Sequence, residues 1–137
     1  MKKSDTEFAL EWMDKAKNDF ITAQQTLALP DGPTDTPSFH CQQAVEKSLK
    51  ALLTFHHISF PKIHDLLQLL DMSSPLLPCL DKYREKFAAI AGYAVEVRYP
   101  GNGFNPSRED AKEALRVAEE VISMVTSNIT SSQNKSA

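Results

Sequence analysis

The segment FHCQQAVEKSLKALL, residues 39–53, places amide, carboxylate and ammonium groups on what its spacing predicts to be one long helix. At about 100° per residue, Gln42 projects between Leu49 and Leu53, which belong to the apolar arc of this helix. A buried amide without a hydrogen-bond partner costs about 1–3 kcal/mol. We therefore expect Gln42 to have a partner on another helix, on a second subunit or in a ligand.

The same helix carries charged groups that could bind an anion or another protein. Glu46 lies at the edge of the apolar arc. Lys47 and Lys50 lie on the remaining polar strip, because residues three or four apart stack along one side of a helix. His40 and Gln43 flank them. This strip is either a solvated face or an electropositive ridge that faces a nucleotide phosphate or a partner protein.

Arg98 is the strongest single candidate for a ligand-binding residue. It projects in line with Phe87 and Ala91, on the apolar stripe of a later predicted helix. Arginine is always charged and is rarely buried without a partner. Arg98 is therefore either a structural cation, for example one paired with Glu46, or a planar donor for a phosphate or an acidic partner. Tyr99 follows it and belongs to the same candidate ligand-binding set.

His64 and Asp65 stand at the start of a short predicted helix. Asp65 suits the first turn, where a carboxylate can accept from free backbone N–H groups. His64 either belongs to this helix start or lines a polar pocket with Gln42 and Arg98.

The sequence predicts no metal site and no cofactor. The spacing of His56, His57 and His64 matches no metal-binding motif. The GNG segment at residues 101–103 lacks the Lys-Ser/Thr pair of a phosphate-binding loop and does not follow a strand. No Ser-His-Asp arrangement stands out, so we expect no catalytic residues of these kinds.

Composition and charge indicate one soluble globular domain. The chain has 137 residues, of which 42% are hydrophobic and 24% are charged. No apolar run approaches the ~20 residues of a membrane span, and the N-terminal segment lacks a secretory signal, so we expect a cytoplasmic protein. The net charge of −3 argues against avid binding to nucleic acid. Cys41 and Cys79 both fall among apolar neighbours and are expected to be reduced, buried thiols.

Hydrophobic periodicity predicts helices throughout and no strand. The segment YAVEVRY, residues 93–99, is the single strand candidate, but it continues a helical stripe. The fold class is therefore all-α, an up-and-down helical bundle of four long helices and one short helix. Residues 1–128 form the domain, and residues 129–137 form a disordered C-terminal tail. The expected helices are 5–29, 37 or 38 to 57, 64–71, 78–99, and one that starts after a cap at Ser107 and extends through Val125.

Four segments follow one another along the chain: QQAVEKSLKALL, HDL after a short loop, RYP at the end of a long helix, and a final Ala-rich helix. Their order resembles the HEPN domain family. The name abbreviates higher eukaryotes and prokaryotes nucleotide-binding. The resemblance implies a prokaryotic helical bundle, commonly a homodimer, that binds nucleotides or helps to position a substrate for a nucleotidyltransferase. It also implies a minimal nucleotidyltransferase partner in a two-protein, often toxin–antitoxin, module.

One branch of the family consists of ribonucleases that carry an Arg followed four to six residues later by a His. This chain departs from that branch, since its last histidine is His64 and its first arginine is Arg84. The resemblance therefore favours a non-catalytic binding and interaction protein. A ribonuclease toxin that uses other residues and a structural dimer without ligand remain the alternatives.

A homodimer is also expected from the apolar surface of two predicted helices. The second helix is apolar over more than half of its circumference, and the fourth carries Tyr83, Tyr93 and Tyr99 beside a wide apolar stripe. A small bundle has limited interior to cover this surface, so part of it could be shared between subunits.

Overall fold

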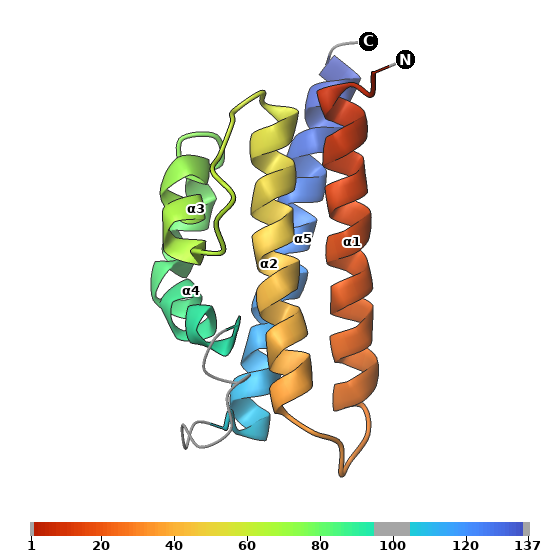
Figure 1. Cartoon of the computed structure of the whole chain (residues 1–137), viewed down its shortest axis with the longest axis vertical. Coiled ribbons are helices and arrows are strands. Elements are labelled where there is room, and N and C mark those ends of the chain that lie inside the picture. The colour runs from red at the N-terminus through yellow and green to blue at the C-terminus, as the bar shows by residue number, and fades with distance from the viewer. Residues whose placement is uncertain (1, 95–104, 136–137) are drawn as a thin grey trace.

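The computed structural model describes residues 2–94 and 105–135, which form a bundle of helices (Figure 1). No strand occurs in these ranges, so the all-α prediction is confirmed. The elements in chain order are α1 (Asp5–Leu27), α2 (Asp35–Phe55), α3 (Leu66–Ser73), the 3₁₀ turn η1 (Pro78–Tyr83), α4 (Arg84–Ala91), the 3₁₀ turn η2 (Gly92–Ala94) and α5 (Arg108–Lys135).

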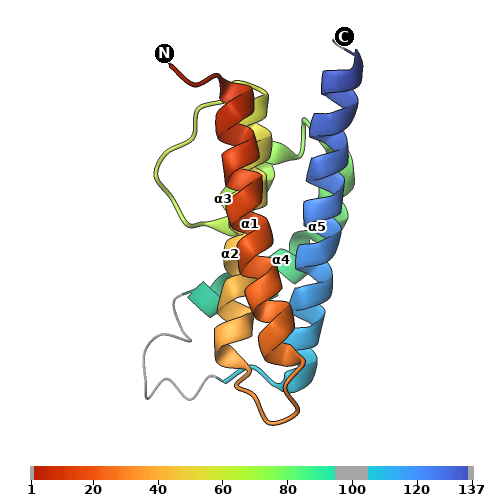
Figure 2. The same cartoon turned by 90° about the vertical axis from the view of Figure 1, so that its right-hand side faces the viewer.

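Helix α2 occupies the centre of the bundle. The long helices α1 and α5 run beside it, and α3 and α4 stack on its other side (Figure 1). A view from the side shows α1 and α5 converging toward the end of the bundle where α1 ends and α5 begins (Figure 2). The start of α1 and the end of α5 lie at the opposite end, where Figure 2 shows the two helices apart. None of the described helices is both long and apolar enough to cross a membrane.

Helix α1 begins as predicted and packs closely against its neighbours. Ser4 caps it, because the Ser4 Oγ accepts from the backbone N–H of Glu7 at 3.1 Å while the Glu7 carboxylate accepts from the backbone N–H of Ser4. Ala9, Ala16 and Ala23 are fully buried on its inner face. Their small side chains permit a close approach between helices.

The far end of the bundle is tied together by side chains near the start of α5. The Arg108 guanidinium donates to the backbone carbonyls of Leu27 and Leu29, at 2.6 and 2.9 Å. A cation at this position satisfies carbonyls at the end of α1 and complements its dipole. Thr34, before α2, donates its hydroxyl to the carbonyl of Pro106 at 2.6 Å.

Helix α2 ends with a residue in the left-handed region. His57 has a φ of 62°. The backbone N–H of Ile58 donates to the carbonyl of Leu53 at 2.9 Å, and that of His57 donates to Thr54 at 3.1 Å. These two bonds form the Schellman motif that commonly ends a helix, although glycine is the usual residue at the left-handed position.

The predicted fourth helix, 78–99, differs from the observed structure. Its first part is the 3₁₀ turn η1, and the α-helical part is limited to α4. Pro78 occupies the first turn of η1, where its missing backbone N–H costs no intrahelical hydrogen bond, and 3₁₀ turns are frequent at the start of an α-helix. After η2, residues 95–99 lie outside the described ranges, which leaves most of the strand candidate 93–99 there as well.

The C-terminal helix extends further than predicted, because the chain stays helical to Lys135 where a disordered tail was expected from residue 129. Ile129 is 2% exposed, and this burial outweighs the weak helix propensity of the serines and threonines around it. Of the two thiols, Cys41 is buried as predicted, but Cys79 is exposed. The η1 turn places the Cys79 sulfur 3.5 Å from that of Met124.

Candidate functional site

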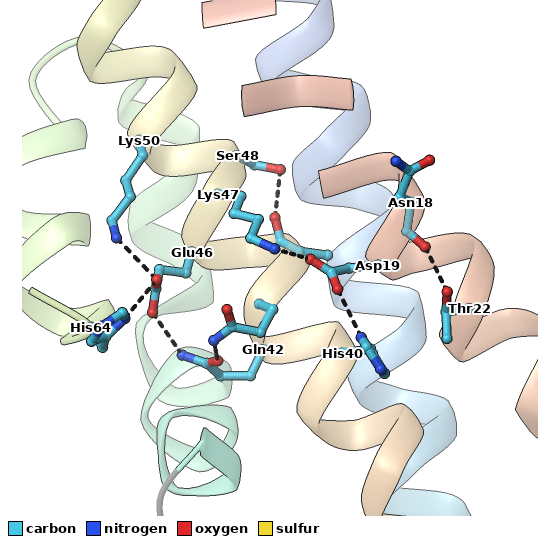
Figure 3. A network of polar contacts seen from close by, with 12 residues as sticks. Asn18, Asp19, Thr22, His40, Gln42, Glu46, Lys47, Ser48, Lys50 and His64 are labelled. Carbon is cyan, nitrogen blue, oxygen red and sulfur yellow. Dashed lines mark hydrogen bonds and ion pairs between the residues drawn. The ribbon is translucent and has the colours of Figure 1, made fainter. Parts of the chain in front are cut away.

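Polar side chains gather along one face of α2 in two groups (Figure 3). The first, which we call the Glu46 cluster, consists of Gln42, Gln43, Glu46 and Lys50 from α2 and His64 from the segment before α3. The second, the Asp19 cluster, consists of Asp19 from α1 and His40 and Lys47 from α2. The polar strip that the sequence predicts on this helix supplies His40, Gln43, Lys47 and Lys50, whereas Gln42 was placed within the apolar arc and Glu46 at its edge.

Glu46 is the centre of the first cluster and is 2% exposed. Its Oε2 accepts from the Lys50 ammonium at 3.0 Å and lies 3.0 Å from His64 Nδ1. Its Oε1 accepts from the Gln42 amide at 3.3 Å. A buried carboxylate needs such partners, because its desolvation costs several kcal/mol.

Gln42 is fully buried and has the partner that its position requires. In addition to its bond with Glu46, its carbonyl oxygen accepts from the Gln43 amide at 2.6 Å. Both partners lie on α2 itself, whereas the sequence suggested another helix, a second subunit or a ligand. The burial was thus predicted correctly, and within the described residues the helix satisfies the amide by itself.

The Asp19 cluster links α1 to α2. Asp19 Oδ1 lies 2.7 Å from His40 Nδ1, and Oδ2 accepts from the Lys47 ammonium at 2.6 Å. Asp19 was not identified from the sequence, although a signal was present. It stands between Ala16 and Ala23 on the buried stripe of α1, where a carboxylate is unexpected without a cationic partner.

The two lysines of the predicted strip have different surroundings. Lys47 reaches across to α1 and keeps 23% of its side chain exposed. Lys50 is 8% exposed, so the solvated-face interpretation is wrong for it. Its ammonium group lies 5.5 Å from the centre of the Trp12 ring, at a distance that permits a cation–π interaction.

His64 and Gln42 share Glu46 as a hydrogen-bond partner, and His64 keeps 75% of its side chain exposed. The predicted polar pocket also includes Arg98. Asp65 acts as the predicted anchor, since its carboxylate accepts from the backbone N–H groups of Leu67 and Gln68. Arg98 and Tyr99 lie outside the described residues.

The chemistry available on this face is recognition by hydrogen bonds and charge. A carboxylate can only accept hydrogen bonds, so the Nδ1 atom of His40 donates to Asp19 and that of His64 donates to Glu46. Burial raises the pKa of the nearby Cys41 thiol to about 12, with a further contribution from Asp19. Cys41 is therefore neutral near pH 7 and unsuited to act as a nucleophile. The described ranges contain no group of three or more His, Cys, Asp or Glu side chains that could hold a metal.

Comparisons with known proteins agree with this architecture. The model of the HEPN domain matches residues 9–129. The structure of TT1696 from Thermus thermophilus is similar with a TM-score of 0.75 and 25% identity, over 88% of this chain and 97% of that chain. ST0689, an archaeal HEPN homologue, has the same fold, with a TM-score of 0.62 and 22% identity over 94% and 99% of the two chains. No curated protein matches significantly. The chain belongs to the HEPN domain family.

Proposed function

We propose that this chain is a non-catalytic HEPN protein that binds a nucleotide on the polar face of α2. It would act with a minimal nucleotidyltransferase, in a cytoplasmic two-protein module of the toxin–antitoxin kind. Membership of the family supports this proposal. The arrangement of Lys47, Lys50 and His40 on one face of α2, with His64 reaching it from the segment before α3, supports the position of the ligand.

The observation that carries the proposal is that carboxylates hold Lys47 and Lys50 in place. Asp19 and Glu46 are 11% and 2% exposed at their side chains, and each fixes one ammonium group. Each ammonium has three N–H donors, so donors remain for a phosphate. Because the lysines are already ordered, binding would cost little additional side-chain entropy. From the sequence, Arg98 and Tyr99 stay in the proposed ligand-binding set.

The test is calorimetric titration with the four nucleoside triphosphates, on the wild type and on Lys47→Met. Loss of one charge-assisted contact should weaken binding by about 1.5–3 kcal/mol. The fold should survive, because His40 still pairs with Asp19. Lys112→Met is the matched control, since Lys112 is exposed on α5 and its ammonium group forms a long ion pair of 3.8 Å with the exposed Glu109. Absence of any nucleotide binding by the wild type would refute this part of the proposal.

The proposed partner can be tested by co-expression with any nucleotidyltransferase encoded beside this gene. A stable complex in size-exclusion chromatography is the expected result. If the two proteins elute separately, the result would count against the two-protein module.

The proposal that the chain is not a ribonuclease rests on the absent Arg-x(4–6)-His motif. A hydroxyl attack on RNA needs a base and an acid with pKa values near neutrality, which histidine usually provides. Incubation of the purified protein with RNA in the presence of EDTA should leave the RNA intact. Cleavage that disappears in His64→Ala would favour the ribonuclease alternative.

A further inference from the structure

Helix α1 carries a hollow that is separate from the polar side chains of α2 described above. It is lined by Phe8, Glu11, Trp12 and Lys15, and its volume is about 190 Å³. The two aromatic residues are four positions apart, so they lie one turn above each other on the helix. Phe8 is 44% exposed. The walls of this hollow, which we call the α1 hollow, are mostly apolar.

Positive charges surround the two rings. The Lys50 ammonium lies 5.5 Å from the centre of the Trp12 ring, and the Lys3 ammonium lies 5.8 Å from that of Phe8. Lys15 lines the hollow and has no hydrogen bond or ion pair with the residues that the structure describes. An aromatic surface next to ammonium groups suits a ligand with a flat ring at one end and negative charge at the other.

Lys50 of the Glu46 cluster does not line this hollow, but its ammonium group contacts Trp12, which does. Its ammonium group donates to Glu46 on α2 while it lies near the Trp12 ring of α1. The α1 hollow therefore lies next to the Glu46 cluster, with the Trp12 ring and the Lys50 side chain between them. A ligand whose phosphates reach that face would have its other end close to Trp12.

We propose that the α1 hollow receives the base of the nucleotide, which stacks on Trp12 and Phe8 while its phosphates meet Lys15 and the lysines of α2. This inference rests on the proposed function and adds the position of the base. The volume is consistent with it, since whole drug-sized ligands occupy about 300–1,000 Å³ and a hollow of about 190 Å³ suits one flat ring system. Glu11 also lies in the lining; its Oε1 already accepts from the Lys3 ammonium, and its Oε2 can accept from an amino group on the base.

Calorimetric titration with ATP, GTP and inorganic triphosphate tests the inference on the wild type, Trp12→Leu and Phe8→Leu. Stacking of a base on an aromatic side chain contributes to binding affinity, and loss of that contact typically lowers the affinity about tenfold. We expect this loss for ATP or GTP in both variants, and no change for inorganic triphosphate, which has no base. Leu10→Ala is the matched control, because Leu10 is also 44% exposed on α1 but does not line the hollow.

Fluorescence provides a direct second readout, since Trp12 is the single tryptophan of the chain. A base stacked on its ring should quench its emission during titration with ATP or GTP, and inorganic triphosphate should not.

Each contrary result separates the inference from the proposed function. If nucleotides bind and neither Trp12→Leu nor Phe8→Leu weakens them, the inference is wrong and the proposed function stands. The same holds if inorganic triphosphate binds the wild type as tightly as ATP and GTP do. If both variants change the mass measured by light scattering and leave nucleotide affinity unchanged, the hollow is a subunit contact and the inference is wrong. If the wild type binds no nucleotide, both proposals fail.

Discussion

At the scale of single residues, Glu46 determines whether the polar face can exist inside the bundle. It contacts Gln42, Lys50 and His64, and it is almost completely buried. Glu46→Gln keeps the shape of the side chain but leaves the buried Lys50 ammonium without its counter-charge. Removing one partner of a buried pair typically lowers the free energy of unfolding by about 3–5 kcal/mol.

Urea unfolding of Glu46→Gln measures this loss directly. Glu119→Gln is the control, because Glu119 is exposed on α5 and should change stability little. A variant as stable as the wild type would mean that Lys50 turns to solvent at no cost.

The two thiols should react at very different rates. Cys79 is exposed and Cys41 is fully buried. A disulfide reagent such as DTNB at pH 8 should therefore label one thiol per chain quickly and the second only after unfolding. Cys79→Ser should abolish the fast phase, whereas Cys41→Ala should retain it. Rapid labelling of two thiols in the native wild type would contradict the burial of Cys41.

Cys41 also makes stability depend on pH in the alkaline range. Its native pKa is raised to about 12, mainly by burial, while the ordinary value for a thiol is 9.0. The unfolded chain therefore loses this proton first as pH rises. The contribution is fully present below pH 9 and is lost progressively toward pH 12. Cys41→Ala should show a smaller decrease in unfolding free energy between pH 9 and 11 than the wild type, and equal slopes would contradict the assignment.

The sequence predicted the burial of these residues better than their partners. The helical period is enough to place Gln42 among leucines, and a buried amide must be satisfied, so a partner could be expected. Whether Lys47 or Lys50 faces α1 depends on which helix covers each side of α2. The hydrophobic periodicity of the sequence does not show this arrangement. Asp19 is a further example. Its position on an apolar stripe is visible in the sequence, but its partner His40 stands 21 residues later, on the next helix.

At the scale of elements, helix ends with clear caps were predicted well, and ends that depend on packing were not. Ser107 and Asp65 stand at the starts of α5 and α3 as expected, since their side-chain oxygens accept from free backbone N–H groups. The extension of α5 depends on the burial of Ile129 against the core, which local propensity does not reveal. The 3₁₀ geometry of η1 is a tighter first part of the same helical segment, and an apolar stripe that includes Leu80 and Tyr83 does not distinguish it from an α-helix.

The end of α2 offers a stabilising substitution. His57 adopts a φ of 62°, which costs a side chain with a Cβ about 1–2 kcal/mol relative to glycine. His57→Gly should therefore raise the free energy of unfolding by about 1 kcal/mol. The contact of His57 with Asp5 involves two exposed side chains and contributes little.

Urea unfolding also measures the effect of His57→Gly. The adjacent His56 serves as the control, because its φ is −91° and His56→Gly should only lower stability by adding freedom to the unfolded chain. A loss of stability in His57→Gly would show that the exposed contact with Asp5 outweighs the backbone strain.

At the scale of the whole molecule, the apolar circumference of α2 is covered by its own chain. Helices α1, α5 and α3 pack around it, so this surface no longer supports the expected homodimer. Within the described ranges, the exposed large apolar side chains lie on α1 and in the loop after it: Phe8, Leu10, Ile21 and Leu29. Leu10 and Ile21 are separated by about three turns, and so lie on the same side of α1.

A homodimer remains a prediction, and α1 is the surface on which it can be tested. Light scattering at micromolar concentration should give twice the chain mass of 15.3 kDa. The double variant Leu10→Glu/Ile21→Glu should reduce this to one chain mass, because charges at the centre of an apolar contact are strongly unfavourable. A wild type with the mass of one chain would refute the dimer, and a variant that stays dimeric would exclude this side of α1.

The position of the two chain ends has a consequence for engineering. Helix α1 begins and α5 ends at the same end of the bundle (Figures 1 and 2), so a linker long enough to span the gap between them could join them. New ends could then be opened between Pro61 and Lys62, which are both exposed in the connection before α3. Circular permutation is tolerated mostly at such exposed loops. In the permuted chain α3 would come first and α2 last, and every contact between α1, α2 and α5 could form as before. The packing of this bundle is thus separable from the order in which its helices are synthesised.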